Sequence, residues 1–184
     1  KATARLLSVV AVAASTSAAA ADATPIYDLV VYGGTSGGIV AAIQARAMGK
    51  TAVLIEPSGH VGGLTAGGLG ATDIGNKSAI GGLSREFYRR IAEHYASDDA
   101  WVHQQRESYQ SGRGSGDSGA EEMWTFEPHV AEQVYLNWIH EAGVELVMRE
   151  RLVRDGRGVE MEGPWIKAIS TTAGRRFAGR MFID

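Results

Sequence analysis

A glycine-rich turn and one carboxylate, separated by about 20 residues, could together hold a dinucleotide. The turn is Gly33-Gly34-Thr35-Ser36-Gly37-Gly38, and the carboxylate belongs to Glu56. Glycines bring backbone N–H groups close to a pyrophosphate because they carry no Cβ, and the N-terminus of a following helix favours the same anion. A carboxylate at the end of the next strand can accept hydrogen bonds from both hydroxyls of an adenosine ribose. It would also repel a 2′-phosphate, so NADP is disfavoured as the ligand.

The segments around the turn have the patterns needed to position these groups. Residues 27–32 form an apolar run, residues 39–48 read as a helix, and residues 51–55 form a second, β-branched run that ends at Glu56. Together they predict a strand, a turn, a helix and a strand, which is one βαβ unit. Thr35 departs from the usual pattern, because it stands where a second glycine would let the backbone approach the phosphates most closely. The alternative is a βαβ unit without a ligand, which the acid at the expected spacing disfavours.

A second glycine-rich stretch follows at residues 57–70. Val61, Leu64 and Leu69 are interleaved with its glycines, so a backbone held close to a ligand is expected rather than a freely moving surface loop. Nicotinamide-binding domains have no special need for such a stretch at this place, whereas in flavoproteins it runs along the pyrophosphate towards the flavin ring. The second stretch therefore favours a flavin over a nicotinamide cofactor.

Five stretches of the sequence carry a resemblance to a known family, namely residues 27–56, 60–69, 75–88, 124–132 and 181–184. As a set they resemble the FAD-dependent oxidoreductase family, within the glutathione-reductase-like class of two-dinucleotide-fold flavoproteins. The resemblance implies an α/β, Rossmann-like FAD/NAD(P)-binding fold with a parallel sheet, flanking helices and a three-stranded β-meander. It also implies that FAD is the cofactor, that a Gly-Gly-Thr turn is tolerated, and that the chain is an N-terminal fragment without its substrate domain.

The glycine patterns and the resemblance together indicate which residues contact the cofactor. The first turn would bind the pyrophosphate, and Glu56 would bind the ribose. The second stretch would lie beside the flavin, and the resemblance implies that the backbone of Leu152 contacts the adenine. The predicted cofactor-binding residues are Gly33, Gly34, Thr35, Ser36, Gly37, Gly38, Glu56, Gly62, Gly63, Leu64, Thr65, Gly67, Gly68 and Leu152. No residue is assigned as a general base, so the catalytic residues are unknown at this stage. No metal site is expected, since His129 and His140 are too far apart along one helix for metal-ligand spacing.

Two further helices are predicted. Residues 83–96 form an amphipathic helix with Ser84 as its N-cap and its arginines on a solvated face, and another helix starts at Glu127-Pro128. Asn76 and Lys77 in the preceding loop either lie on the flavin's substrate side or form a polar turn. The residues expected on the buried faces are Phe87, Ile91 and Tyr95 in the first helix and Val130, Val134, Tyr135, Trp138 and Ile139 in the second.

The rest of the chain predicts a loop and several strands. Residues 97–122 are rich in Ser, Gly, Asp and Gln and predict a flexible loop. Residues 144–148 predict a third parallel strand. The three strands of the meander are expected at residues 151–154, 165–172 and 177–183.

The N-terminal residues 1–23 predict an export signal. We therefore expect residues 24–184 to form the FAD-binding domain, and we expect the protein to be exported. Lys1 and Arg5 precede a short apolar core and a small-residue cleavage site, and that core is too short to span a membrane. The chain has no cysteine, which excludes disulfides, thiolate metal sites and a cysteinyl-flavin link. Its net charge is −3 without a basic cluster, so nucleic acid is disfavoured as a partner.

The leading hypothesis is the FAD-binding part of an oxidoreductase that acts on a small organic molecule. One alternative is a non-catalytic nucleotide-binding domain or remnant, and another is an NAD-dependent dehydrogenase. The substrate, the electron acceptor and the oligomeric state are not indicated by the sequence.

Overall fold

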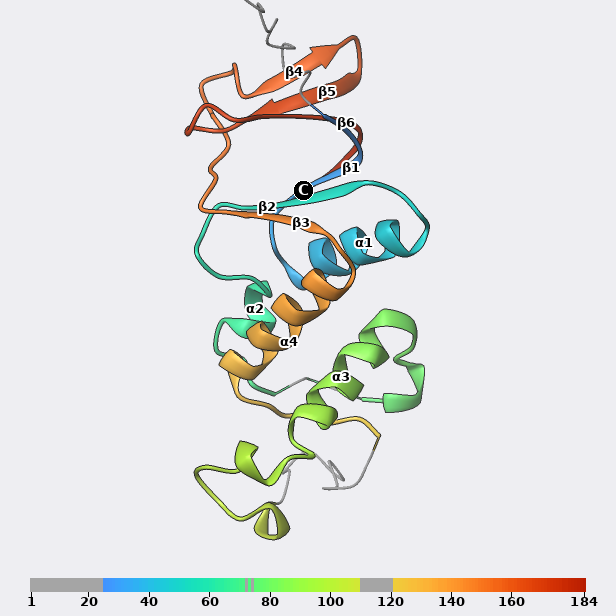
Figure 1. Cartoon of the computed structure of the whole chain (residues 1–184), viewed down its shortest axis with the longest axis vertical. Coiled ribbons are helices and arrows are strands. Elements are labelled where there is room, and N and C mark those ends of the chain that lie inside the picture. The colour runs from blue at the N-terminus through green and yellow to red at the C-terminus, as the bar shows by residue number, and fades with distance from the viewer. Residues whose placement is uncertain (1–24, 72, 74, 110–120) are drawn as a thin grey trace, which may run out of the picture.

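The computed structural model describes residues 25–71, 73, 75–109 and 121–184, which form a six-stranded sheet with helices packed on one face (Figure 1). The strands are β1 Ile26–Tyr32, β2 Ala52–Glu56, β3 Glu145–Met148, β4 Val159–Glu162, β5 Trp165–Ser170 and β6 Arg176–Ile183. The α-helices are α1 Ser36–Ala47, α2 Gly63–Ala66, α3 Gly82–His94 and α4 Pro128–Glu141. Three short 3₁₀ helices, η1 Lys77–Ala79, η2 Asp98–Ala100 and η3 Arg106–Ser108, lie before and after α3.

The sheet has the order β3-β2-β1-β6-β5-β4. Strands β3, β2, β1 and β6 are parallel to one another, whereas β5 runs antiparallel to both of its neighbours, β6 and β4. Strand β6 joins both halves, because its first residues pair with β5 and residues from Ala178 onward pair with β1. The parallel sheet and the three-stranded meander are therefore confirmed.

The first strand of the meander was predicted in the wrong place. Residues 151–154 contribute only an isolated bridge between Leu152 and Thr171, and β4 lies later, at Val159–Glu162. The chain bends between these segments at Gly156, whose φ is 85°, and at Gly158, where an added Cβ would lie 1.8 Å from the carbonyl oxygen of Val153. This bend moves the segment that can pair along β5 to residues beyond Gly158.

Alternating side chains of the parallel strands build two apolar clusters. Val31 and Leu54 face the helices, while Val30, Val53 and Ile55 belong to the cluster on the opposite face. This alternation follows from the two-residue period of a strand. Both faces of the parallel strands are therefore buried, which explains their continuous apolar sequence.

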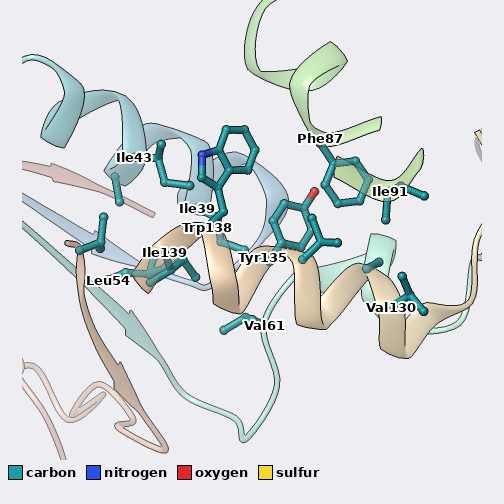
Figure 2. Packing of buried hydrophobic residues seen from close by; sticks show 14 of the residues in the cluster. Ile39, Ile43, Leu54, Val61, Phe87, Ile91, Val130, Tyr135, Trp138 and Ile139 are labelled. Carbon is teal, nitrogen blue, oxygen red and sulfur yellow. The ribbon is translucent and has the colours of Figure 1, made fainter. Parts of the chain in front are cut away.

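The larger cluster forms where α1, α3 and α4 meet β2 (Figure 2). The eight residues predicted for the buried faces of α3 and α4 are all buried, from Ile91 at 0% exposed to Val134 at 8%. Phe87 of α3 stacks on Tyr135 of α4, with ring centroids 4.5 Å apart and planes inclined by 16°. These contacts fix α3 against α4 on the helical side of the sheet.

Two predictions about α3 are wrong. The helix begins at Gly82 with Gly81 as its N-cap, because the Arg85 N–H donates to the Gly81 carbonyl and closes the first turn before Ser84. Arg85 is not on a solvated face: it is half-buried and donates to the carbonyls of Ile80 and Lys77 and to Glu122. The guanidinium of Arg90 also packs, lying 4.7 Å from the ring centroid of Trp138.

Parts of two predictions lie outside the described residues. These are the export signal at residues 1–23 and residues 110–120 of the predicted loop. The described part of that loop carries η2 and η3. Among the helices that the structure describes, none is long and apolar enough to cross a membrane.

The burial of Ile91 predicts a large stability difference between two identical substitutions. Ile91→Ala should lower the free energy of unfolding by about 2–5 kcal/mol, because it leaves a cavity among α3, α4 and the loops around them. The matched control Ile26→Ala removes the same atoms from a side chain that is 69% exposed, so its effect should be within about 1 kcal/mol. Urea unfolding of both variants measures the difference, and equal losses would contradict this packing.

Candidate dinucleotide-binding site

The first glycine turn is held between the ends of β1 and β2. Gly33 has a φ of 115°, which favours glycine, and its N–H donates to the Ile55 carbonyl over 2.8 Å. Thr35 is the N-cap of α1, and its Oγ1 accepts a hydrogen bond from the Gly38 N–H over 3.2 Å. An added Cβ at Gly38 would lie 2.2 Å from the Gly33 carbonyl oxygen, so only glycine permits this approach of helix and turn. The unpaired N–H groups of the first helical turn are therefore presented beside the turn.

Glu56 lies against this turn, as predicted. Its side chain is buried, and its Oε2 accepts a hydrogen bond from the Gly34 N–H over 2.7 Å. Its Oε1 accepts from the Ser58 N–H over 2.6 Å. Each carboxylate oxygen has a further lone pair, so ribose hydroxyls could donate to the same group. The carboxylate therefore has two possible tasks, which are to fix the backbone on both sides of it and to bind a ribose.

The second glycine-rich stretch adjoins the first through backbone contacts. The Gly62 N–H donates to the Gly34 carbonyl over 2.7 Å, and the Ser36 hydroxyl donates to the Gly62 carbonyl over 3.1 Å. Gly62 and Gly63 have φ values of 100° and 53°; Gly62 is the N-cap of α2 and Gly63 is its first residue. Both glycine stretches consequently lie beside the carboxyl ends of the two neighbouring strands β1 and β2.

The predicted cofactor residues differ in their surroundings. Thr35, Gly37, Gly63, Leu64, Gly67 and Gly68 are exposed, whereas Ser36 and Thr65 are half-buried. Ser36 Oγ and Thr65 Oγ1 lie 2.8 Å apart and share a hydrogen bond, which connects the two stretches through side chains as well. The exposed members form a surface that a ligand can reach.

Leu152 comes close to these strand ends, although its position in the chain is distant. Its N–H donates to the Tyr32 hydroxyl over 2.9 Å, and the N–H of nearby Glu150 donates to the Glu56 carbonyl over 3.1 Å. The structure therefore places Leu152 near the ends of β1 and β2. Its contact with adenine stays a prediction, and its N–H already has an acceptor in Tyr32.

Two residues of α4 support the site and were not predicted to do so. The Tyr135 hydroxyl is hydrogen-bonded to Ser36 and Thr65, and burial raises the pKa of this phenol, so it stays neutral. Glu132 accepts hydrogen bonds from the Val61 N–H and from His60 Nδ1, each over 3.1 Å. The sequence indicated only that Tyr135 is buried, because its polar partners come from segments far away in the chain.

The loop before α3 has the character of a structured turn. The Asn76 side chain accepts hydrogen bonds from the N–H and the hydroxyl of Ser78, which caps η1. Lys77 Nζ lies 5.9 Å from the ring centroid of Trp124. These contacts support the polar-turn interpretation for Asn76. In the described part of the chain, no three metal-ligating side chains come together.

Comparisons with known proteins show the family of this chain. A model of the family described as FAD dependent oxidoreductase matches residues 28–184. A comparison with curated protein sequences found no match.

Solved structures resemble the fold at low sequence identity. L-amino acid deaminase from Proteus vulgaris has a TM-score of 0.54 and 17% identity, with 85% of this chain and 46% of that chain covered. The same enzyme with its specific insertion sequence deleted has a TM-score of 0.52 and 15% identity, with 87% and 53% covered. L-proline dehydrogenase from P. horikoshii has a TM-score of 0.51 and 14% identity, with 87% and 52% covered. The chain thus spans about half the length of these proteins.

The family match includes both glycine stretches and Glu56, and it reaches the last residue of β6 and beyond. The chain therefore belongs to the family of FAD dependent oxidoreductases.

Proposed function

We propose that this chain is the FAD-binding part of an oxidoreductase that acts on a small organic molecule. The observation that carries the proposal is the buried Glu56 carboxylate, whose Oε2 lies 2.7 Å from the Gly34 nitrogen of the glycine turn. In this proposal Glu56 is the ribose acceptor and the N-terminus of α1 binds the pyrophosphate, which is the arrangement that an adenine dinucleotide requires. Bound FAD would supply the redox chemistry, while the protein supplies position and electrostatics.

Individual residues have distinct tasks in this proposal. The first turn of α1 and the exposed backbone of Thr35 and Gly37 bind the pyrophosphate. Glu56 accepts hydrogen bonds from the ribose, and Gly62 and Gly63 let the second stretch continue beside the cofactor. Leu152 is proposed to meet the adenine through its backbone. Gly67 and Gly68 lie further along the second stretch, on the side proposed for the flavin.

The family match favours a flavin over the alternative of an NAD-dependent dehydrogenase. We also propose that residues 1–23 are an export leader, because they have the composition of one. If they are such a leader, N-terminal sequencing of the protein recovered outside the cytoplasm should start near residues 21–24. A mature protein that retains the apolar segment of residues 6–14 would contradict the export proposal.

The cofactor proposal predicts a yellow protein. The purified chain should show flavin absorption, and the nucleotide released by heat should be FAD. Gly38→Ala should abolish this absorption and lower the melting temperature, because its Cβ would lie 2.2 Å from the Gly33 carbonyl oxygen.

Gly75→Ala is the matched control for Gly38→Ala. A Cβ at Gly75 would meet no atom within 4 Å, and Gly75 is not one of the predicted cofactor-binding residues. This variant should therefore retain FAD. Equal FAD content in the two variants would contradict the described geometry of the turn, and release of NAD in place of FAD would contradict the cofactor proposal.

The ribose contact predicts a specific loss of affinity. Glu56→Ala should weaken FAD binding about tenfold or more, because a hydrogen bond to a charged group contributes about 1.5–3 kcal/mol. Isothermal titration of the apoprotein with FAD measures this loss.

A second titration separates the ribose contact from the effect of Glu56 on the turn. It uses an FAD analogue that lacks the 2′-hydroxyl of the adenosine ribose. The wild-type chain should prefer FAD to the analogue, and Glu56→Ala should bind both equally. If the preference survives in the variant, Glu56 stabilises the turn without binding the ribose.

A further inference from the structure

A second candidate binding site lies at the end of the second glycine-rich stretch. It is a cavity of about 290 Å³, close to the lower end of the roughly 300–1,000 Å³ usual for small-molecule sites. Its wall comes from Gly70, from the residues that follow α3 and from the segment before α4. None of the predicted cofactor-binding residues lines it, so it is a separate site.

Three aromatic rings form one part of the wall. The ring centroids of Tyr95 and Trp101 are 5.4 Å apart, and those of Trp101 and Tyr109 are 5.2 Å apart, with the planes inclined by 56° in each pair. Hydrogen bonds fix the positions of two of these rings. Trp101 Nε1 donates to the Tyr95 carbonyl, and the hydroxyls of Tyr109 and Thr125 are hydrogen-bonded to each other. The wall is therefore a fixed set of tilted aromatic faces and edges.

One carboxylate, that of Glu127, stands among the described lining residues. Its Oε2 accepts a hydrogen bond from the Tyr95 hydroxyl over 2.9 Å, and the same hydroxyl accepts one from the Glu127 N–H. Burial raises the pKa of Tyr95, so its phenol stays a donor towards the carboxylate. Within the part of the chain that the structure describes, no Lys or Arg forms an ion pair with Glu127.

The cavity is connected to the glycine-rich stretch by backbone contacts. The Phe126 N–H donates to the Gly70 carbonyl over 2.8 Å, and Ala71 and Thr125 form an isolated antiparallel bridge. These contacts position the residue before Glu127 directly. Two of the lining residues, Val102 and His103, are exposed, so the cavity can be reached from solvent.

We propose that this cavity binds an organic ammonium ion that carries an apolar or aromatic group. Aromatic faces attract cations through their quadrupole. The Glu127 carboxylate, which has no Lys or Arg ion-pair partner among the described residues, supplies the complementary charge. The apolar remainder of the ligand would contact Met123 and Phe126, which also line the cavity. The proposal does not depend on FAD, because the lining residues are distinct from those assigned to the cofactor.

The test compares a cation with a neutral molecule of similar size. Benzylamine and benzyl alcohol are titrated into the full chain at neutral pH, with calorimetry and Trp fluorescence as readouts. The wild-type chain should bind benzylamine about tenfold more tightly or better, and Glu127→Gln should remove the preference. The glutamine still offers an oxygen to the Tyr95 hydroxyl, so the wall should stay in place.

Two further variants make the outcome specific. Glu93→Gln removes an exposed carboxylate from α3 without touching the cavity and should leave benzylamine binding unchanged. Trp101→Leu should weaken the binding of both molecules, because it removes the central ring. Equal binding of the two molecules by the wild-type chain, or a preference that survives in Glu127→Gln, would overturn the proposal.

Bound FAD is measured in the same samples by its absorption. If FAD is retained while the preference for benzylamine is absent, only the ammonium site is contradicted. If the preference is present while FAD cannot be bound, the site stands and the proposed cofactor function fails.

Discussion

The hydrogen bonds of the Glu56 carboxylate tie together the parts of the molecule that face the candidate site. One oxygen accepts from Gly34 in the first glycine turn and the other from Ser58 at the start of the second stretch. Because the group is buried, a missing partner would leave an uncompensated charge in a poorly solvated place. Sheet, turn and following loop therefore share one anchor, and the residue proposed to recognise ribose is also the residue that shapes its surroundings.

A second set of contacts extends this anchor to the helical layer. Ser36, Thr65 and Tyr135 join their hydroxyls, while Glu132 of the same helix accepts from the Val61 N–H. Helix α4 thus holds the second glycine-rich stretch from behind, although it follows that stretch by many residues in the sequence. Backbone and side chains from three separate segments are thus hydrogen-bonded to one another on the protein side of the site.

Features with a local cause were predictable from the sequence. The βαβ unit, the buried faces of α3 and α4 and the approach of Glu56 to the turn follow from periodicity, turn chemistry and a fixed spacing. The start of α3 and the position of β4 were predicted wrongly, because backbone geometry at Gly81–Gly82 and at Gly156–Gly158 decides them and side-chain patterns do not indicate it. The role of Arg85 was predicted wrongly because one of its partners, Glu122, is 37 residues away in the sequence. The hydrogen bonds of the Tyr135 hydroxyl were not predicted either, because an apolar pattern indicates that a side chain is buried but not which polar groups it contacts.

Strand β6 pairs with β1 along one part of its length and with β5 along another. A strand that is shared in this way couples the antiparallel hairpin to the strand that ends at the glycine turn. The hairpin of β4 and β5 is therefore more than a cover at the margin of the sheet. Its detachment would remove hydrogen bonds from the start of β6 and loosen the support of β1, so local opening at the hairpin and order at the dinucleotide site are thermodynamically linked.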